Sequence, residues 1–321
     1  QHAVEARDAA MVRDDQGRVS FDDMVYIPLA LKFARPWYTM VVVDEAQDMN
    51  YGQLLLARAA CKKGGRIVVV GDDRQAIYGF RGADADGIGR LKTELSAKEL
   101  GLTVTYRCAK SIVGAVSHIV PDFTAGDANP VGIVDVIFKD KLVAEAKPGD
   151  FVLSRANAPL MPICLAFLRK GIRARIEGRD VAAGLRAIVQ SMKAKSVPSF
   201  IERVGGWREK QITRAARLKR QEARESKIDH VNDQADMLIS LAEGCASVAE
   251  ILTRTETLFG DSATASPQDA VVCSSVHRSK GLEADRVFVL ADTVSDRDRE
   301  EANIYYVAVT RAKRHLTWVR K

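Results

Sequence analysis

The chain lacks three features that would assign it to familiar classes of protein. Its cysteines are scattered and include no C-x-x-C pair, so inert thiols are predicted rather than a zinc site or a disulfide framework. No apolar run approaches the roughly 18 residues that a membrane-spanning helix needs. The first residues show no signal-peptide pattern. These absences favour a globular protein of the cytoplasm.

Composition and charge indicate a folded chain with one unusual segment. With 321 residues, 47% hydrophobic and 28% charged, the chain can form two or more domains with real cores. Eight of its basic residues and three glutamates lie between Arg208 and Lys227, a surplus of five (8 − 3) within a net charge of +6. This segment is either a solvated helix face or a surface for phosphate contact through Arg214, Arg217 and Arg220.

Short β-branched runs alternate with helical patterns in the first hundred residues. Residues 39–44 and 66–71 are typical of parallel strands that are covered on both faces. Residues 54–63 between them predict a helix, and another helix is expected at 84–96. Strand, helix and strand in this order predict a right-handed crossover in an α/β sheet.

A second series of strands and helices follows, with a helical stretch inside it. Strands are expected at 100–107, 132–138, 150–155, 270–276, 286–290 and 315–319, and helices at 159–170 and 299–312. From about residue 178 to 262 strand signals vanish and charged helical patterns replace them. The fold class is therefore α/β, with two parallel-sheet domains and a helical insertion in the second.

Paired carboxylates end the first strand, in the sequence VVVDEAQD at 41–48. The carboxyl ends of strands are where such sheets bind ligands. Hydrolysis of a nucleoside triphosphate needs a metal ion and a group that orients water. Asp44 and Glu45 suit these tasks if neighbouring strand residues point to different sides. The alternative is a helix N-cap followed by a first-turn acid.

The second motif, GDDRQAIYGFRGAD at 71–84, resembles a nucleotide-sensing loop, yet no phosphate-binding loop accompanies it. The pattern G-x-x-x-x-G-K-[ST] does not occur, and no glycine is followed by lysine. Nucleotide-binding α/β folds normally carry that loop after their first strand. Since residue 1 is Gln rather than Met, we expect that the N-terminal part of the protein is missing from this sequence.

Five motifs in order resemble the UvrD/Rep/PcrA group of superfamily 1 DNA helicases. They are DEAQD at 44–48, GDDRQAIYGFRGAD at 71–84, TYR at 105–107, SVHRSKGLE at 275–283 and YVAVTRAK at 306–313. The resemblance implies two RecA-like domains. Residues 1–97 would be an incomplete first domain, 98–178 and 266–321 the second, and 179–265 a reduced accessory insertion.

The resemblance also implies a site for ATP and Mg²⁺. Asp44 and Glu45 would hold the metal, with Glu45 also orienting the attacking water. Gln75 would sense the γ-phosphate. Arg107 and Arg311 would be arginine fingers, and replacing either would abolish turnover with little loss of fold. Glu283 would accept a hydrogen bond from the ribose of the nucleotide.

By the same resemblance, other residues of these motifs would contact DNA. Tyr78 and Phe80 would stack on unpaired bases, although Phe80 also suits a core aromatic. Backbone contacts or polar coupling would come from Arg81, His277, Arg278 and Lys280. The alternative for His277 is an ordinary polar loop residue.

The function implied is an ATP-dependent helicase that moves 3′ to 5′ on single-stranded DNA. Its partners would be single strands, duplex junctions, and accessory proteins of DNA repair or replication. The isolated chain is expected to be inactive because it lacks the phosphate loop. Two alternatives stay open: a nucleic-acid-binding remnant that no longer hydrolyses ATP, and the helicase part of a helicase-nuclease.

Overall fold

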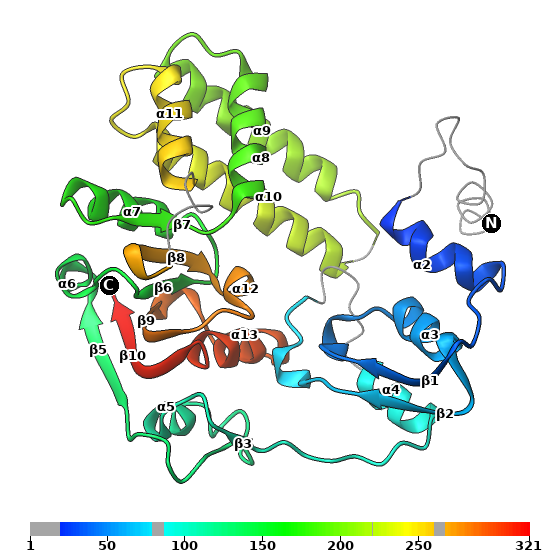
Figure 1. The fold of residues 1–321 in the computed structure, drawn as a ribbon. Helices are drawn as coiled ribbons and strands as arrows, with labels where there is room; N and C mark the ends of the chain where they lie inside the picture. The colour runs from blue at the N-terminus through cyan, green and yellow to red at the C-terminus, as the bar shows by residue number, and fades with distance from the viewer. Residues whose placement is uncertain (1–19, 79–86, 220, 260–266) are drawn as a thin grey trace. The chain divides into compact units, whose positions relative to one another are not determined.

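The computed structural model describes residues 20–78, 87–219, 221–259 and 267–321. The chain divides into two compact units, unit 1 (Gln1–Gly101) and unit 2 (Leu102–Lys321). Each unit contains a parallel sheet with helices packed on it (Figure 1). This confirms the predicted α/β class, while the finer domain limits remain a prediction.

Unit 1 is built on a two-stranded parallel sheet. Its described elements are α2 (Phe21–Ala30), β1 (Tyr38–Val43), η1 (Ala46–Asp48), α3 (Tyr51–Ala60), β2 (Cys61–Val69), η2 (Asp73–Gln75) and α4 (Gly87–Glu94). Val43 of β1 and Leu54 of α3 are buried together on one side. On the other face of β1, Tyr38, Met40 and Val42 are exposed, as expected from the two-residue period of a strand.

Local signals explain where the helices of unit 1 begin. Ser20 with Asp23, and Asn50 with Gln53, form reciprocal capping boxes at the starts of α2 and α3. The helix predicted over 54–63 is too long at its end, because Cys61 is already extended and pairs with Tyr38 of β1. The run after Ala60 has no apolar period to continue the helix, and ladder bonds to β1 stabilise the strand instead.

Unit 2 contains a six-stranded, all-parallel sheet in the order β5-β10-β9-β6-β8-β7. Its strands are β5 (Ile133–Phe138), β6 (Phe151–Ser154), β7 (Ala174–Ile176), β8 (Val271–Ser275), β9 (Ala284–Leu290) and β10 (Ala312–Arg320). The helices between them are α5 (Lys110–Gly114), α6 (Lys139–Glu145), α7 (Leu160–Arg169), α12 (Val276–Ser279) and α13 (Arg299–Val309), with turns η4 (Pro267–Asp269) and η5 (Ala291–Thr293). β6 and β8 are buried along their whole length, which explains their continuous apolar sequences.

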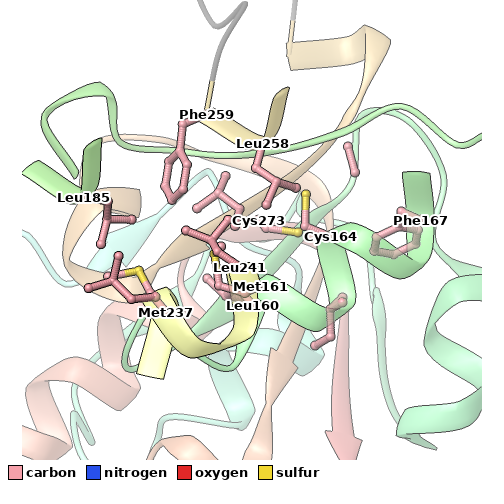
Figure 2. Close-up of a cluster of buried hydrophobic side chains, with 14 of the residues drawn as sticks. Leu160, Met161, Cys164, Phe167, Leu185, Met237, Leu241, Leu258, Phe259 and Cys273 are labelled. Carbon is pink, nitrogen blue, oxygen red and sulfur yellow. The ribbon is translucent and has the colours of Figure 1, made fainter. Parts of the chain in front are cut away.

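The predicted helical stretch leaves the sheet after β7 and returns at β8, its neighbour. It comprises α8 (Arg179–Met192), α9 (Val197–Ala215), α10 (Gln221–Ala242) and α11 (Val248–Phe259). Figure 2 shows side chains of α7, α8, α10 and α11 converging with Cys273 of β8 in one cluster. The insertion therefore shares its hydrophobic core with the sheet.

Two further expectations about unit 2 need correction. Only Val104–Thr105 (β3) of the strand expected at 100–107 forms, and it pairs with β4 (Thr124–Ala125) in a separate small sheet. The helix expected at 299–312 ends at Val309, because the Thr310 hydroxyl donates to the carbonyl of Tyr306 and Ala312 already pairs with β9. Among the described helices, none has both the length and the apolar character needed to cross a lipid bilayer.

Candidate functional site

The paired carboxylates lie directly after β1 and are exposed. Asp44 Oδ1 accepts a hydrogen bond of 2.9 Å from the backbone N–H of Glu45. Glu45 has φ 51° and ψ 40°, in the left-handed region that residues with a Cβ rarely adopt. This conformation, rather than the alternation expected within a strand, sets the two side chains apart.

Gln47, which sequence reasoning gave no role, connects the acids to the second motif. Its amide Nε2 donates to Glu45 Oε2 at 2.6 Å, and its Oε1 accepts from the backbone N–H of Asp72 at 3.0 Å. Asp72 Oδ2 in turn accepts from Gln75 Nε2 at 2.9 Å. Glu45 and the predicted sensor Gln75 are thus joined by one chain of hydrogen bonds. A Cβ on Gly71 would lie 2.7 Å from Gln47 Oε1, so the loop needs glycine for this close approach.

Replacing Gln47 by leucine tests this connection. Gln47 is only 2% exposed, and replacing it by leucine removes its hydrogen bonds to Glu45 and to the part-buried N–H of Asp72. We expect the free energy of unfolding of unit 1 to fall by about 1 to 3 kcal/mol. Urea denaturation of the chain measures this, with Gln190→Leu on the exposed surface of α8 as the matched control. Equal stability of the two variants would contradict a structural role for the Gln47 amide.

The donor set after β1 suits a magnesium ion that is completed by other ligands. Mg²⁺ in nucleotide enzymes is held through one or two carboxylates, water and phosphate oxygens. Within the described ranges, Asp44 Oδ2 makes no hydrogen bond or ion pair, and it is open to solvent. No cluster of three or more metal-ligating side chains occurs in the same ranges. Asp44, with Glu45 beside it, therefore fits a metal that brings its own waters.

In unit 2, residues from three distant motifs lie together. Arg107 Nε is 2.6 Å from Glu283 Oε2, and Lys313 Nζ is 2.6 Å from Glu283 Oε1. The hydrogen bond from Lys313 is the main reason that the pKa of Glu283 lies below its ordinary value, so this carboxylate stays ionised. The motifs TYR, SKGLE and TRAK thus contribute to one cluster.

Arg311 belongs to the same region but faces inward. It is 2% exposed, and its guanidinium donates to the carbonyls of Val307 at 3.0 Å and Leu282 at 3.1 Å and to the hydroxyl of Thr310 at 3.3 Å. Burial, followed by the charge of Arg107, lowers its pKa. These buried hydrogen bonds argue against the expectation that Arg311 is removable with little loss of fold.

Cys108 follows Arg107 in the chain, and its thiol is influenced by the charges of Arg107 and Arg311. Its thiol is buried and lies 3.7 Å from the carbonyl oxygen of Thr310. Burial raises its pKa to about 11 even though both arginines oppose the shift. The thiolate is therefore absent at neutral pH, and Cys108 is not a nucleophile.

The residues predicted to contact DNA are only partly described. Phe80 and Arg81 lie outside the described residues, and Tyr78 is half-buried. His277 and Arg278 lie on α12, and Lys280 follows it. The described residues therefore place three of the six side chains on one short turn of unit 2.

One ion pair and one hydrogen-bond contact hold this turn to its surroundings. Arg278 pairs with Asp180 at the start of α8, and this contact lowers the pKa of Asp180. His277 Nδ1 lies 3.5 Å from Arg155 Nη1, and Arg155 Nε donates to Glu301 at 2.9 Å. The predicted DNA-contacting turn is thereby linked to the helical insertion and to α13.

The basic segment forms the ends of α9 and α10. Arg208 pairs with Asp236. The other described cations of the segment form no ion pair with a described acid, and they are Lys210, Arg214, Arg217, Lys219, Arg224 and Lys227. Five of these six are exposed, and Arg224 is half-buried. An uncompensated positive surface therefore runs along this end of the helix pair.

Comparison with known proteins matches both ends of the chain. Residues 13–96 match the family described as UvrD/REP helicase N-terminal domain, and residues 270–319 match the UvrD-like helicase C-terminal domain. DNA helicase II of Haemophilus influenzae is 30% identical over 116 residues, which are 33% of this chain and 16% of that protein. The ATP-dependent DNA helicase PcrA of Staphylococcus epidermidis is 32% identical over 111 residues, 32% of this chain and 15% of that protein.

A third relative, DNA helicase II of Escherichia coli, is 34% identical over 94 residues, 29% of this chain and 13% of that protein. The aligned part of the chain therefore spans about one sixth of these relatives or less.

Proposed function

The chain belongs to the UvrD/Rep/PcrA-type helicases, and from this premise we propose that its protein is an ATP-dependent DNA helicase moving 3′ to 5′ on single-stranded DNA. The observation that carries the proposal is the meeting of Arg107, Glu283, Arg311 and Lys313 in unit 2. A protein that only binds nucleic acid has no chemical need for buried and exposed cations around one carboxylate.

Residue roles follow from the chemistry of phosphoryl transfer. A Mg²⁺ ion held by the chain would supply positive charge that offsets the charge of the nucleotide's phosphates. Asp44 would hold the metal, and Glu45 would orient the attacking water. Gln75 would report the γ-phosphate, and the hydrogen bonds through Asp72 and Gln47 support its coupling to Glu45.

In unit 2, Arg107 is the side chain best suited to act as a finger. It is about half exposed, with 45% of its side chain accessible, and its only described ion pair is with the half-exposed Glu283. Arg311 would need to leave its buried carbonyl contacts to reach a phosphate. Glu283 would serve the ribose in the nucleotide-bound state.

DNA would be bound by stacking and by phosphate contacts. Tyr78 and Phe80 would stack on unpaired bases without sequence preference. Arg81, His277, Arg278 and Lys280 would supply the polar contacts. The protein would act in the cytoplasm on single strands and duplex junctions, with accessory repair or replication proteins as partners.

The experiment that tests this function measures ATP hydrolysis and strand separation by the intact protein. Single-stranded DNA should stimulate hydrolysis, and Glu45→Gln should remove the stimulated activity. Arg169→Ala, an exposed change on α7, should leave it unchanged. DNA binding without any ATP hydrolysis would overturn the helicase proposal in favour of a non-hydrolysing remnant. The 321-residue chain alone should bind ATP weakly, because it contains no phosphate-binding loop.

The basic end of α9 and α10 gives a separate prediction. Joint replacement of Arg214, Arg217 and Arg220 by alanine should flatten the dependence of DNA affinity on salt, because each lost phosphate contact removes about 0.7 to 0.9 from the slope of log K against log salt. Anisotropy titrations from about 50 to 200 mM salt measure the slope.

The matched control is joint replacement of Arg169, Lys170 and Arg173, three exposed cations between the end of α7 and the start of β7. If both triple variants showed the same slope of log K against log salt, the basic segment would be a solvated helix face and not a surface for phosphate contact.

A further inference from the structure

Glu283 is the centre of an ion-pair bridge that no sequence motif predicted. Its two carboxylate oxygens each contact one cation, Arg107 Nε at 2.6 Å and Lys313 Nζ at 2.6 Å. Arg107 follows β3, Glu283 precedes β9, and Lys313 lies in β10. Three segments that are far apart in the chain therefore present one carboxylate between two cations.

Backbone pairing, and not side-chain attraction alone, sets this arrangement. The N–H of Ala109 donates to the carbonyl of Lys313 at 2.8 Å, which ties the segment after Arg107 to β10. The N–H of Ala284 donates to the carbonyl of Arg311 at 3.0 Å, which ties the residue after Glu283 to the same turn. The three side chains are thus held near one another whether or not the ion pairs form.

The cluster carries more positive than negative charge. Arg107 and Lys313 contact a single carboxylate, Glu283, and the buried Arg311 is close enough to be influenced by its charge. This leaves a surplus of two positive charges (3 − 1). Arg107 and Arg311 are close enough for each other's charge to be felt, since Arg107 contributes to the lowered pKa of Arg311. Such crowding of cations is unfavourable unless further negative charge is bound nearby.

The bridge is open to solutes. The side chains of Arg107, Glu283 and Lys313 are 45%, 36% and 38% exposed. Ion pairs with this exposure contribute little to stability. Replacing Glu283 by another anion on the two cations therefore costs little free energy. A carboxylate and a phosphate offer matching oxygen pairs to an arginine, and a lysine binds phosphate as a point charge.

We propose that Lys313 and Arg107 form a polyphosphate-binding pair in which Glu283 occupies the position of phosphate oxygens until a nucleoside triphosphate replaces it. The inference rests on the proposed function, because it assigns a further phosphate ligand and a resident competitor to the same site. Lys313 is thereby a third cation of the nucleotide site, beside the two arginines. Glu283 pairs with both exposed cations until the triphosphate displaces it.

The test is a calorimetric titration of the 321-residue chain with inorganic tripolyphosphate. The chain carries the triple change of Arg214, Arg217 and Arg220 to alanine, which removes competing binding to the basic helix ends. Lys313→Ala should weaken binding by about tenfold, as expected for one lost charge-assisted contact. Lys313→Arg should restore most of the affinity. The matched control is Lys321→Ala. Lys321 directly follows β10 and pairs with Asp292, and this variant should bind tripolyphosphate like the parent.

Glu283→Gln gives the decisive result, because it removes the resident competitor without changing the size of the side chain. It should tighten tripolyphosphate binding by about fivefold or more. Weaker binding by this variant would overturn the proposed competition. Absence of binding by the parent chain, or equal binding by parent and Lys313→Ala, would overturn the site itself. Thermal melting of each variant checks that the fold is retained.

The result of the tripolyphosphate titration does not depend on whether the protein is a helicase. If the intact protein hydrolyses no ATP while the chain shows the expected tripolyphosphate pattern, the helicase function fails and the anion site stands. If hydrolysis is stimulated by DNA while Lys313→Ala binds tripolyphosphate like the parent, the function stands and this inference fails.

Discussion

Replacing Arg311 by alanine is expected to lower the free energy of unfolding of unit 2 by about 3 kcal/mol. The guanidinium is 2% exposed and donates to two carbonyls and one hydroxyl. Alanine removes these three hydrogen bonds, so that the Val307 carbonyl keeps only the Thr310 hydroxyl at 3.3 Å as a side-chain donor. It also opens a cavity between α13 and the segment before β9. Arg311→Lys should lose less, because it keeps one donor group but cannot reproduce the planar fork.

Urea denaturation of the chain, followed by circular dichroism, measures this loss. Arg314→Ala is the matched control, since Arg314 lies in β10, which begins directly after Arg311, and is exposed. If Arg311→Ala were as stable as the control variant, the buried hydrogen bonds of Arg311 would contribute nothing to the free energy of unfolding. Any loss of turnover in Arg311→Ala must be corrected for unfolded protein before it is assigned to catalysis.

Replacing Arg107 by alanine should give the opposite pattern in the intact protein. We expect the rate constant kcat for DNA-stimulated ATP hydrolysis to fall by about 10³-fold or more, as for other arginine fingers. Stability should change by less than about 0.5 kcal/mol, because exposed ion pairs contribute little. Arg107 makes its described side-chain contact with Glu283 at a half-exposed site.

Steady-state kinetics and thermal melting on the same preparations separate the two effects. Arg169→Ala changes an exposed arginine in the same unit and should alter neither. If Arg107→Ala retained turnover within about tenfold of the parent, Arg107 would not be an arginine finger, and the bridge to Glu283 would be an ordinary surface ion pair. Loss of turnover with a matching loss of stability would indicate a structural role.

The two arginines show how far the sequence reaches. Both were predicted from motifs to serve the same phosphate, because each follows a family pattern at its own position. A motif identifies the residue type and the segment, but not whether the side chain is open to solvent. The structure separates them: Arg107 lies on an exposed carboxylate, whereas Arg311 is held by carbonyls within unit 2.

The fold class was readable because strands and helices of an α/β sheet leave local signals. The buried strands β6, β8 and β9 appear as continuous apolar runs, and α7 appears through its helical period. The short strand β3 was overestimated, since an apolar run does not show whether a pairing partner exists along its whole length. The end of α3 was misplaced because Lys62 and Lys63 carry no strand signal, whereas Cys61 and Arg66 on either side of them pair with β1.

By itself, the sequence determined the family, the order of the motifs and the chemical types available to the site. These follow from local patterns, which depend on neighbouring residues in the chain. The tertiary structure alone decided that Gln47 joins Glu45 to Asp72, that Arg311 is buried, and that Glu283 lies between Arg107 and Lys313. Each of these is a contact between segments brought together by sheet pairing, and the energy of such contacts depends on distance and burial, which no local pattern encodes.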